Sequence, residues 1–432
     1  MKLAIIGGAG VRVPLLVNGL IGRGLPFSEI ALFDPNRARL DVIARLAAAR
    51  SGRASVTLHD TVGDCVAGAD FVVTSIRVGG LAARQHDETI SLARGVVGQE
   101  TVGPGGFAMG VRTVPILNAY VREIAERAPS AWVINFSNPV GLVTQAMHRA
   151  APGLRIVGIC DTPTELFAEI AHALDVAAAD CSFDYVGLNH LGWVRDVRRN
   201  DESLLAPAWQ DRNVLGRIYS RPLFDADYLA DLRLLPTEYV YYYAFPDRAV
   251  ANIRAAGTNR GEVVSKLTDR LFTDLAASPA DPVKVYETYL ETRSASYMQI
   301  ESGQPAPKPP SPWAELTGYD RIAFDVIHAI VNDTGAVIPL NVRNDGNIPE
   351  LSKDDVIEVP CAVGASGLLP RQVGALPTQV RDLVLEVKAY ERNTIAAAEA
   401  MTTDALVDAL ASNPLVPSRD LASSLVTELR LT

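Results

Sequence analysis

The chain opens on the stretch LAIIGGAG, which runs from Leu3 to Gly10 and decides the predicted fold. Four apolar residues that suit a strand are followed at once by three glycines, Gly7, Gly8 and Gly10. Glycines in such a turn allow the backbone to approach a pyrophosphate at the N-terminus of the next helix. The match to G-x-G-x-x-G is incomplete, so an ordinary strand–helix turn is the alternative. We favour a dinucleotide site because of the N-terminal position and the spacing.

Asp34 ends the next predicted strand. A carboxylate at this position accepts hydrogen bonds from ribose hydroxyls and repels a 2′-phosphate. We therefore expect NAD rather than NADP as the cofactor. The alternative is that Asp34 only caps the helix that follows it.

Short β-branched segments alternate with helical patterns over the first 200 residues, which is typical of a parallel sheet with crossover helices. The predicted strands there cover residues 3–6, 29–33, 56–59, 71–74, 131–135 and 155–159, with a crossover helix at 114–127 and a strand or hairpin at 181–197. Beyond them we predict helices at 319–332, 378–401 and 418–429, strands at 336–342 and 355–361, and an exposed Pro-rich loop at 304–312. The pattern predicts an α/β protein with a Rossmann-like NAD-binding domain at 1–195. A mixed α+β catalytic and oligomerisation domain would follow at 196–432.

The composition limits the class of partner. With 432 residues, 48% hydrophobic and 21% charged, the chain has an ordinary globular balance. A net charge of −10 without any Lys/Arg run argues against nucleic acid. No apolar run approaches the roughly 20 residues that span a bilayer, so we expect no membrane partner. Four widely spaced cysteines are too few for a disulfide framework, so we expect a cytoplasmic protein with reduced thiols. The expected partner is a small molecule.

Cys160 and Asp161 follow a predicted strand, and His190 comes later in the segment GLNH. Ligands bind at the carboxyl edge of parallel strands, and a thiolate with an imidazole is a soft ligand pair for a transition metal. Two protein ligands leave positions that substrate oxygens can complete. A lone Cys or His at a strand end is more often a packing residue, and the spacing alone does not decide between these interpretations.

Further polar residues follow other predicted strands. Arg77 and Arg84 come after the strand at 71–74, and Asn135 and Asn138 come after the strand at 131–135. Each segment could be simple turn chemistry, but together with the Gly-rich segment at 97–106 they favour the rim of an active site.

An aromatic run, EYVYYY, covers residues 238–243. If this run is helical, Tyr239, Tyr242 and Tyr243 share one face at i, i+3 and i+4. Core or interface packing is the default interpretation of such a stripe. A phenol can also act as a base once a nearby cation lowers its pKa from about 10.

Taken together, these segments resemble glycoside hydrolase family 4, the NAD- and metal-dependent glycosidases, over almost the whole chain. The resemblance rests on the shared order of GGAG at 7–10, IRVG at 76–79, GVVGQET at 95–101, NFSNP at 135–139, CD at 160–161, GLNH at 187–190, PTEY at 236–239, NDGNIP at 344–349 and NPLVPS at 413–418. The C-terminal half is most similar to the 6-phospho-β-glucosidase branch.

The resemblance implies hydrolysis of 6-phospho-β-glucosides with NAD and with Mn²⁺ or another divalent metal. NAD⁺ would oxidise C3 of the sugar, Tyr239 would remove the C2 proton, and the aglycone would leave C1 by elimination. Water would then add and the ketone would be reduced again, so the reaction is an exception to two-carboxylate hydrolysis. The implied site residues are Tyr239 and Asp161 for catalysis; Cys160 and His190 for the metal; Gly7, Gly8, Gly10, Asp34, Arg77 and Asn135 for NAD; and Arg84, Asn138, Asn189 and Arg260 for the substrate, with both arginines at the 6-phosphate.

Two features depart from the branch. Asp161 stands where the β-acting branch usually carries Asn, and the opening reads GGAGVRVP rather than GGGSxxTP. A family 4 enzyme for α-linked or unphosphorylated glycosides is therefore the alternative. A hydroxy-acid or sugar dehydrogenase is the alternative from another class, although Cys160, His190 and Tyr239 argue against it. Family likeness and apolar late helices also favour a homodimer or homotetramer.

Overall fold

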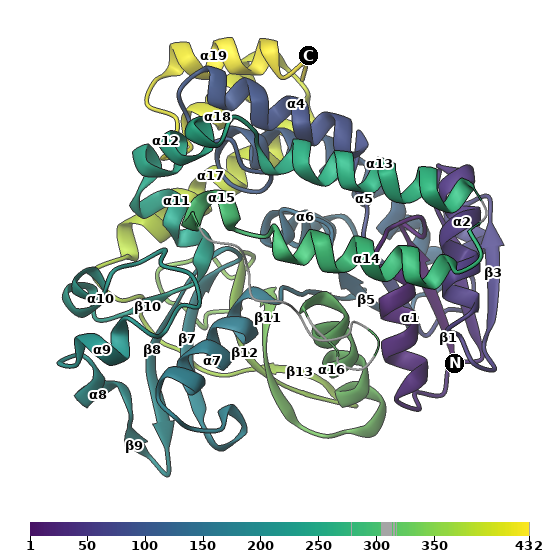
Figure 1. The fold of residues 1–432 in the computed structure, drawn as a ribbon, viewed down its shortest axis with the longest axis horizontal. Helices are drawn as coiled ribbons and strands as arrows, with labels where there is room; N and C mark the ends of the chain where they lie inside the picture. The colour runs from purple at the N-terminus through teal and green to yellow at the C-terminus, as the bar shows by residue number, and fades with distance from the viewer. Residues whose placement is uncertain (278, 304–312, 314–315, 317, 432) are drawn as a thin grey trace.

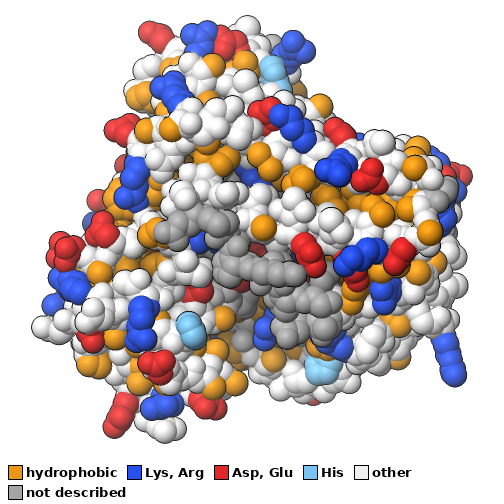
Figure 2. Space-filling view, viewed as in Figure 1, with side chains coloured by type: hydrophobic (Ala, Val, Ile, Leu, Met, Phe, Trp, Pro, Cys, Tyr) orange, Lys and Arg blue, Asp and Glu red, His pale blue; other side chains and the backbone are white. Residues whose placement is uncertain are grey.

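The computed structural model describes residues 1–277, 279–303, 313, 316 and 318–431. The predicted loop at 304–312 lies outside these described residues. Acidic and basic side chains are interspersed over the face shown in Figure 2. None of the described helices is both long and apolar enough to cross a membrane.

The N-terminal half forms the predicted parallel sheet. Its six strands lie in the order β3-β2-β1-β4-β5-β6, and every neighbouring pair is parallel. These strands are β1 (Lys2–Ile6), β2 (Glu29–Phe33), β3 (Ser55–His59), β4 (Phe71–Thr74), β5 (Trp132–Asn135) and β6 (Arg155–Gly158), all within one residue of the predicted bounds. β4 and β5 are buried along their whole length, as expected for strands covered on both faces. The Rossmann-like part of the prediction is confirmed.

The helices of this half connect and cover the parallel strands. They are α1 (Val13–Gly22), α2 (Arg37–Ala48), α3 (Val62–Val66), α4 (Gly80–Ala93), α5 (Gly103–Arg127), α6 (Val140–Ala150) and α7 (Thr162–Ala173). α5 begins eleven residues before the predicted helix at 114–127. The Gly-rich segment is therefore partly helical, because Gly105 and Gly106 allow the first turn of α5 to lie against residues 99–101. A Cβ at these two positions would lie 2.2 Å from Gln99 O and 2.3 Å from Thr101 O.

The same sheet continues into an antiparallel part. β11 (Ala336–Arg343) pairs with β6, and β12 (Val356–Gly364), β7 (Ser182–Leu188), β8 (Leu191–Arg199) and β10 (Leu235–Pro236) follow in that order, with β13 (Gly367–Pro370) and β9 (Glu202–Ser203) attached at the sides. β11 and β12 thus lie between β6 and β7, which are consecutive in the chain. Two late strands therefore join the two halves into one sheet. The division at residue 195, a position within β8, stays a prediction.

Helices dominate the C-terminal half, which confirms the mixed α+β prediction. They are α8 (Leu205–Ala208), α9 (Arg212–Leu215), α10 (Ala226–Leu232), α11 (Tyr241–Ala244), α12 (Pro246–Ala256), α13 (Arg260–Ala276), α14 (Pro282–Ala295), α15 (Gln299–Ser302), α16 (Gly318–Asn332), α17 (Arg381–Ala400), α18 (Thr403–Ala411) and α19 (Arg419–Glu428), with short 3₁₀ turns η1 (Ala178–Asp180) and η2 (Glu238–Val240). Figure 1 shows α13 running from α4 toward α2, with α14 beside it. These two helices cross over the carboxyl ends of the parallel strands and position the site.

Candidate active site

A cavity of about 1120 Å³ lies at the carboxyl ends of the parallel strands. Nine of the fourteen predicted site residues line it: Gly7, Gly10, Asp34, Arg77, Arg84, Asn138, Asp161, Tyr239 and Arg260. Segments that are far apart in the sequence meet there because parallel strands end at the same edge of the sheet. The other five, Gly8, Asn135, Cys160, Asn189 and His190, lie outside this lining.

The glycine turn is hydrogen-bonded to the end of the neighbouring strand β2. The backbone N–H groups of Gly7 and Gly8 both donate to Phe33 O, at 2.9 and 2.8 Å. Gly7 has φ +97°, and a Cβ there would lie 2.2 Å from Ser75 O, so only glycine fits. A Cβ on Gly8 would instead meet Leu32 and the helix after β2. Gly8 therefore allows close packing of the turn and does not line the cavity, and its role toward the cofactor stays a prediction.

Asp34 faces the cavity beside this turn. Its Oδ2 accepts from Ala9 N at 3.3 Å and its Oδ1 accepts from Asn36 N at 2.8 Å. Burial raises the pKa of Asp34, while these two hydrogen bonds oppose the shift. The carboxylate thus supports the loop and still offers oxygens to a ligand.

Helix α13 closes the far end of the cavity, near Asp34. Val264, Thr268 and Phe272 of this helix line the same cavity as the glycine turn. Arg39 of α2 lies 4.6 Å from the Phe272 ring and donates to Asp269 Oδ1 at 3.1 Å. The sequence did not predict this role of α13, because the helix lies more than 200 residues after the turn it covers.

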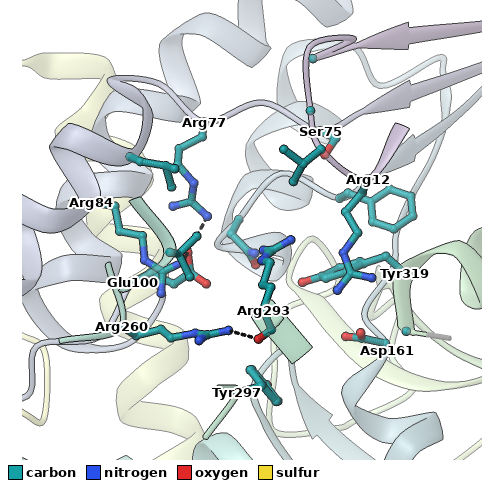
Figure 3. Close-up of a pocket in the computed structure, with 18 of the residues that line it drawn as sticks. Arg12, Ser75, Arg77, Arg84, Glu100, Asp161, Arg260, Arg293, Tyr297 and Tyr319 are labelled. Atoms are coloured by element: carbon teal, nitrogen blue, oxygen red, sulfur yellow. Dashed lines mark hydrogen bonds and ion pairs between the residues drawn. The ribbon is translucent and has the colours of Figure 1, made fainter. Parts of the chain in front are cut away.

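The opposite end of the cavity is rich in arginine. Arg84 is buried and donates to Glu88 at 2.8 Å, and its Nη1 lies 2.8 Å from Glu100 Oε2. Arg77 pairs with the same Glu100 oxygen at 2.5 Å. Arg77 and Arg84 lower the pKa of Glu100 to about 2 against the effect of burial. Arg260 reaches this end from the start of α13, as Figure 3 shows.

Tyr239 lies deep in the cavity, on the short turn η2 rather than on the expected helix. Its ring stacks on the His190 ring, with centroids 3.8 Å apart and planes 3° apart. Tyr297 places its hydroxyl 3.1 Å from the Tyr239 hydroxyl and also donates to the Glu238 carboxylate. Burial raises the pKa of Tyr239, and the hydrogen bond with Tyr297 acts in the opposite direction.

His190 occupies the tight turn between β7 and β8. Its backbone is left-handed, with φ +61°, a conformation that is uncommon outside glycine and is concentrated at functional sites. Nδ1 of its ring lies 2.9 Å from Thr101 Oγ1, which fixes the orientation of the ring. Burial lowers the pKa of His190 to about 4, so the ring is neutral near pH 7.

Cys160 is 1% exposed and its Sγ lies 3.4 Å from Thr162 Oγ1. Burial is the main cause that raises the pKa of this thiol, and Glu358 adds to the effect. Within the described part of the chain, no three His, Cys, Asp or Glu side chains form a metal-binding group. The predicted site uses only two protein ligands and so does not require such a group.

The sheet register connects the predicted metal ligands. Gly158 of β6 pairs with Asn341, Asn341 pairs with Glu358, and Glu358 pairs with Gly187 of β7. These four paired residues form a row across β6, β11, β12 and β7. Cys160 follows the β6 residue at one end of this row, and His190 follows the β7 residue at the other end. Glu358 is buried at the centre and accepts from Asn341 at 2.7 Å and from Asn189 at 3.3 Å. Asn189 thus donates to Glu358 and does not line the cavity, and its role toward the substrate stays a prediction.

The two asparagines after β5 also differ. Asn135 is fully buried, and its amide donates to Thr144 Oγ1 at 3.0 Å and accepts from Thr74 Oγ1 at 2.9 Å. Asn135 therefore holds the turn together and does not line the cavity. Asn138 does line it, and its Oδ1 is buried without a hydrogen-bond partner among the described residues.

Asp161 stands at the start of α7, on the far side of the cavity from Arg84 (Figure 3). Arg12 and Tyr319 lie on the same side, with the guanidinium 5.6 Å from the Tyr319 ring centre. Burial raises the pKa of Asp161, while Arg12 acts against this shift. A carboxyl group with a raised pKa can retain a proton and donate it.

Two family models match this chain. The model described as family 4 glycosyl hydrolase matches residues 2–176, and the model described as its C-terminal domain matches residues 185–416.

The chain belongs to family 4 of the glycosyl hydrolases.

Similar proteins within family 4 carry more specific names. A probable 6-phospho-β-glucosidase from Bacillus subtilis (strain 168) is 33% identical, over 99% of this chain and 95% of the relative. A 6-phospho-β-glucosidase from Escherichia coli (strain K12) is also 33% identical, over 100% of this chain and 95% of the relative. The structure of the 6-phospho-β-glucosidase from Thermotoga maritima with manganese, NAD⁺ and glucose-6-phosphate matches with a TM-score of 0.82. It is 27% identical and the match covers 99% of this chain and 97% of that structure.

The described structure adds site residues to those predicted for this family 4 member. Glu100 and Thr101 stand within the motif GVVGQET, so their place in the motif was a signal that the prediction did not use. Arg293 and Tyr297 had no such signal, because they lie at the end of α14 and after it, where the sequence shows no motif.

Proposed function

We propose that this chain hydrolyses 6-phospho-β-glucosides with the help of NAD and a divalent metal such as Mn²⁺. One observation carries the proposal: a single cavity joins the glycine turn, Tyr239 on His190, and a group of arginines. The two relatives at 33% identity are both named as 6-phospho-β-glucosidases, one of them as probable, which supports the β-linked, phosphorylated substrate.

The glycine turn fits a dinucleotide. Gly7 and Gly10 leave the cavity wall without side chains where a pyrophosphate would approach the start of α1. Asp34 is placed to accept from ribose hydroxyls, and α13 would cover the adenosine end. Arg77 pairs with Glu100, which also pairs with Arg84. We therefore propose that Arg77 supports the substrate-binding end of the cavity rather than binding NAD.

Cys160 and His190 fit a divalent metal by donor chemistry. A thiolate and a neutral imidazole suit Mn²⁺ and its transition-metal neighbours, and substrate oxygens would complete the coordination. The bond between His190 Nδ1 and Thr101 is the kind of outer contact that orients a metal-binding histidine. It leaves Nε2 as the nitrogen for the ion.

When bound, NAD supplies a reversible oxidation of the sugar C3 hydroxyl, and the metal supplies Lewis-acid polarisation of sugar oxygens. Tyr239 removes the C2 proton, which becomes acidic beside an oxidised C3. Asp161 stands across the cavity and would protonate the aglycone oxygen as it leaves C1. Asn138 offers a buried amide oxygen to a sugar hydroxyl. Arg84 and Arg260 hold the 6-phosphate.

The test is release of p-nitrophenol from 6-phosphorylated β- and α-glucosides and from their unphosphorylated forms, with Mn²⁺, NAD⁺ and a reductant. We expect the phosphorylated β-substrate to be preferred. Activity restricted to α-linked or unphosphorylated substrates would transfer the chain to the alternative branch that Asp161 suggests. Accumulation of NADH in proportion to substrate would instead indicate a dehydrogenase.

We also propose that the enzyme is cytoplasmic and forms a homodimer or homotetramer. Family membership supports the assembly, and analytical ultracentrifugation of the full chain tests it. A single monomeric species at micromolar concentration would contradict the proposal.

A further inference from the structure

Arg293 carries a guanidinium group into the centre of the cavity from the last turn of α14. Figure 3 shows this side chain between the group formed by Arg77 and Glu100 and the pair of Arg12 and Tyr319. Its Nη1 is buried and has no hydrogen-bond partner among the described residues. A buried cationic donor without a partner is unfavourable, so the arrangement indicates a ligand of opposite charge.

The charges around Arg293 do not balance. Four arginines, Arg77, Arg84, Arg260 and Arg293, face two carboxylates, Glu88 and Glu100, which leaves two positive charges. Both carboxylates are already engaged. Glu88 accepts from Arg84 and, at 2.6 Å, from the backbone N–H of Gly261, while Glu100 pairs with Arg77 and Arg84.

Arg260 has only uncharged acceptors within the described residues. It donates to Ser296 O at 3.0 Å, to Ser296 Oγ at 2.5 Å and to Arg293 O at 3.1 Å. Burial lowers the pKa of Arg260 to about 10, and the positive charges of Arg293 and Arg84 add to the shift. Burial also lowers the pKa of Arg293, with Arg12 and Arg84 acting in the same direction. Each guanidinium therefore makes the charged form of its neighbours less favourable as long as no anion is bound.

We propose that Arg293 is a third guanidinium ligand of the substrate's 6-phosphate, beside Arg84 and Arg260, and that it helps select phosphorylated sugars. A phosphate dianion supplies the two negative charges that the group lacks, and guanidinium groups suit phosphate oxygens. This inference rests on the proposed function, because it deepens the substrate end of the same cavity.

The sugar phosphate fits this position better than the cofactor pyrophosphate does. Arg293 and Arg260 are held together, because the carbonyl oxygen of Arg293 accepts from Arg260 Nη2. The end of α14 therefore holds the Arg260 guanidinium through its backbone and carries the Arg293 guanidinium into the same cavity. Arg12, beside the glycine turn, already pairs with Asp320 at 3.7 Å, whereas Arg260, at the arginine end, and Arg293 have no carboxylate partner among the described residues.

The test is isothermal titration of the purified full chain, without added cofactor, using glucose 6-phosphate and inorganic phosphate, and separately NAD⁺. We expect Arg293→Gln to weaken binding of both phosphate probes by about tenfold, Arg293→Lys to retain part of it, and NAD⁺ binding to be unchanged. Arg270→Gln is the matched control, because Arg270 is 82% exposed on α13. Thermal midpoints of the ligand-free variants should not fall, since a buried unpaired charge is removed.

Unchanged phosphate binding in Arg293→Gln would overturn the proposal. A loss confined to NAD⁺ binding would also overturn it, and would assign Arg293 to the cofactor pyrophosphate. If Arg293→Gln does not fold, the lysine variant decides, because it keeps the charge and loses only the fork of donors. The direct titration also separates this inference from the proposed function. A chain that binds glucose 6-phosphate through Arg293 but releases no p-nitrophenol would contradict only the proposed hydrolysis.

Discussion

The hydroxyl of Tyr297 lies 3.1 Å from the hydroxyl of Tyr239 and also contacts the Glu238 carboxylate. A phenol has one proton to donate, and a carboxylate is the stronger acceptor. Tyr297 therefore shares its proton between the Glu238 carboxylate and the Tyr239 oxygen, and the contact with Tyr239 opposes the effect of burial on the pKa of Tyr239. The proposed base thus has a fixed partner for its hydroxyl, supplied by a segment 58 residues later in the chain.

Tyr297→Phe should lower kcat by about tenfold while KM changes little, because Tyr239 loses the hydrogen bond that aims its hydroxyl. Steady-state kinetics on p-nitrophenyl 6-phospho-β-glucoside measure both constants. Tyr228→Phe on α10 is the control, since Tyr228 lies outside the cavity lining. A Tyr297→Phe enzyme with the kcat of the original chain would show that the contact does not support catalysis.

Thr101→Val should weaken Mn²⁺ binding by about 10- to 100-fold, because His190 loses the partner of its Nδ1. His190→Gln and Cys160→Ser should abolish tight binding, since each removes one of only two protein ligands. Metal content after dialysis and titration with Mn²⁺ give the affinities. Thr288→Val, at an exposed position of α14, is the matched control. Normal metal content in all three variants would place the ion elsewhere.

Asp34→Ala should weaken NAD⁺ binding by about tenfold, because the ribose loses its acceptor and the turn loses the contact with Ala9. The same change should narrow the preference for NAD⁺ over NADP⁺, since the repulsion of a 2′-phosphate disappears. Titration with each cofactor tests both effects. Asp60→Ala, which removes an exposed carboxylate paired with Arg37, should leave both affinities unchanged. Tighter NAD⁺ binding in Asp34→Ala would contradict the assignment.

His148 should make the folded state sensitive to acid. Burial lowers its pKa to about 4, with Arg343 acting in the same direction. Between pH 6.5 and 4 the unfolded chain therefore binds a proton that the folded chain does not, and stability falls as the pH falls. His148→Gln should reduce this loss by up to about 1.4 kcal/mol per pH unit within that window and have no such effect above pH 7.

Urea denaturation at pH 7, 6 and 5 measures this difference between the variant and the original chain. The comparison is between slopes, because buried carboxyl groups such as Glu358, whose burial raises its pKa to about 7, contribute with the opposite sign. His172→Gln, at an exposed position of α7, serves as the control. Parallel slopes for His148→Gln and the original chain would show that His148 is not buried in its neutral form.

Local sequence predicted some parts of this protein well, for physical reasons. The stretch from Leu3 to Gly10 combines a buried strand with glycines that only a tight turn requires, and the structure confirms both. Asp34, Asn138 and Asp161 each follow the end of a predicted strand. Because parallel strands end at the same edge of a sheet, the shared location of these three residues could be predicted from the strand pairing alone. Family membership also followed from the order of motifs.

Other parts could not be predicted in this way. Gly8, Asn135 and Asn189 stand in the right motifs but turn toward packing partners, because neighbouring residues of a turn point in different directions. The roles of the two asparagines depend on the direction of one side chain each, and that of Gly8 depends on what packs against its backbone; spacing along the chain contains neither kind of information.

The sequence by itself therefore determined the α/β class, the dinucleotide turn and the strand ends that carry Cys160 and Asp161. These are short-range features, set by burial periodicity and by the conformational freedom of glycine. Only the tertiary structure decided that Arg293 and Tyr297 enter the site. Their positions depend on how α13 and α14 pack across the sheet, and a packing contact between distant segments is fixed by the shape of the whole core rather than by any local pattern.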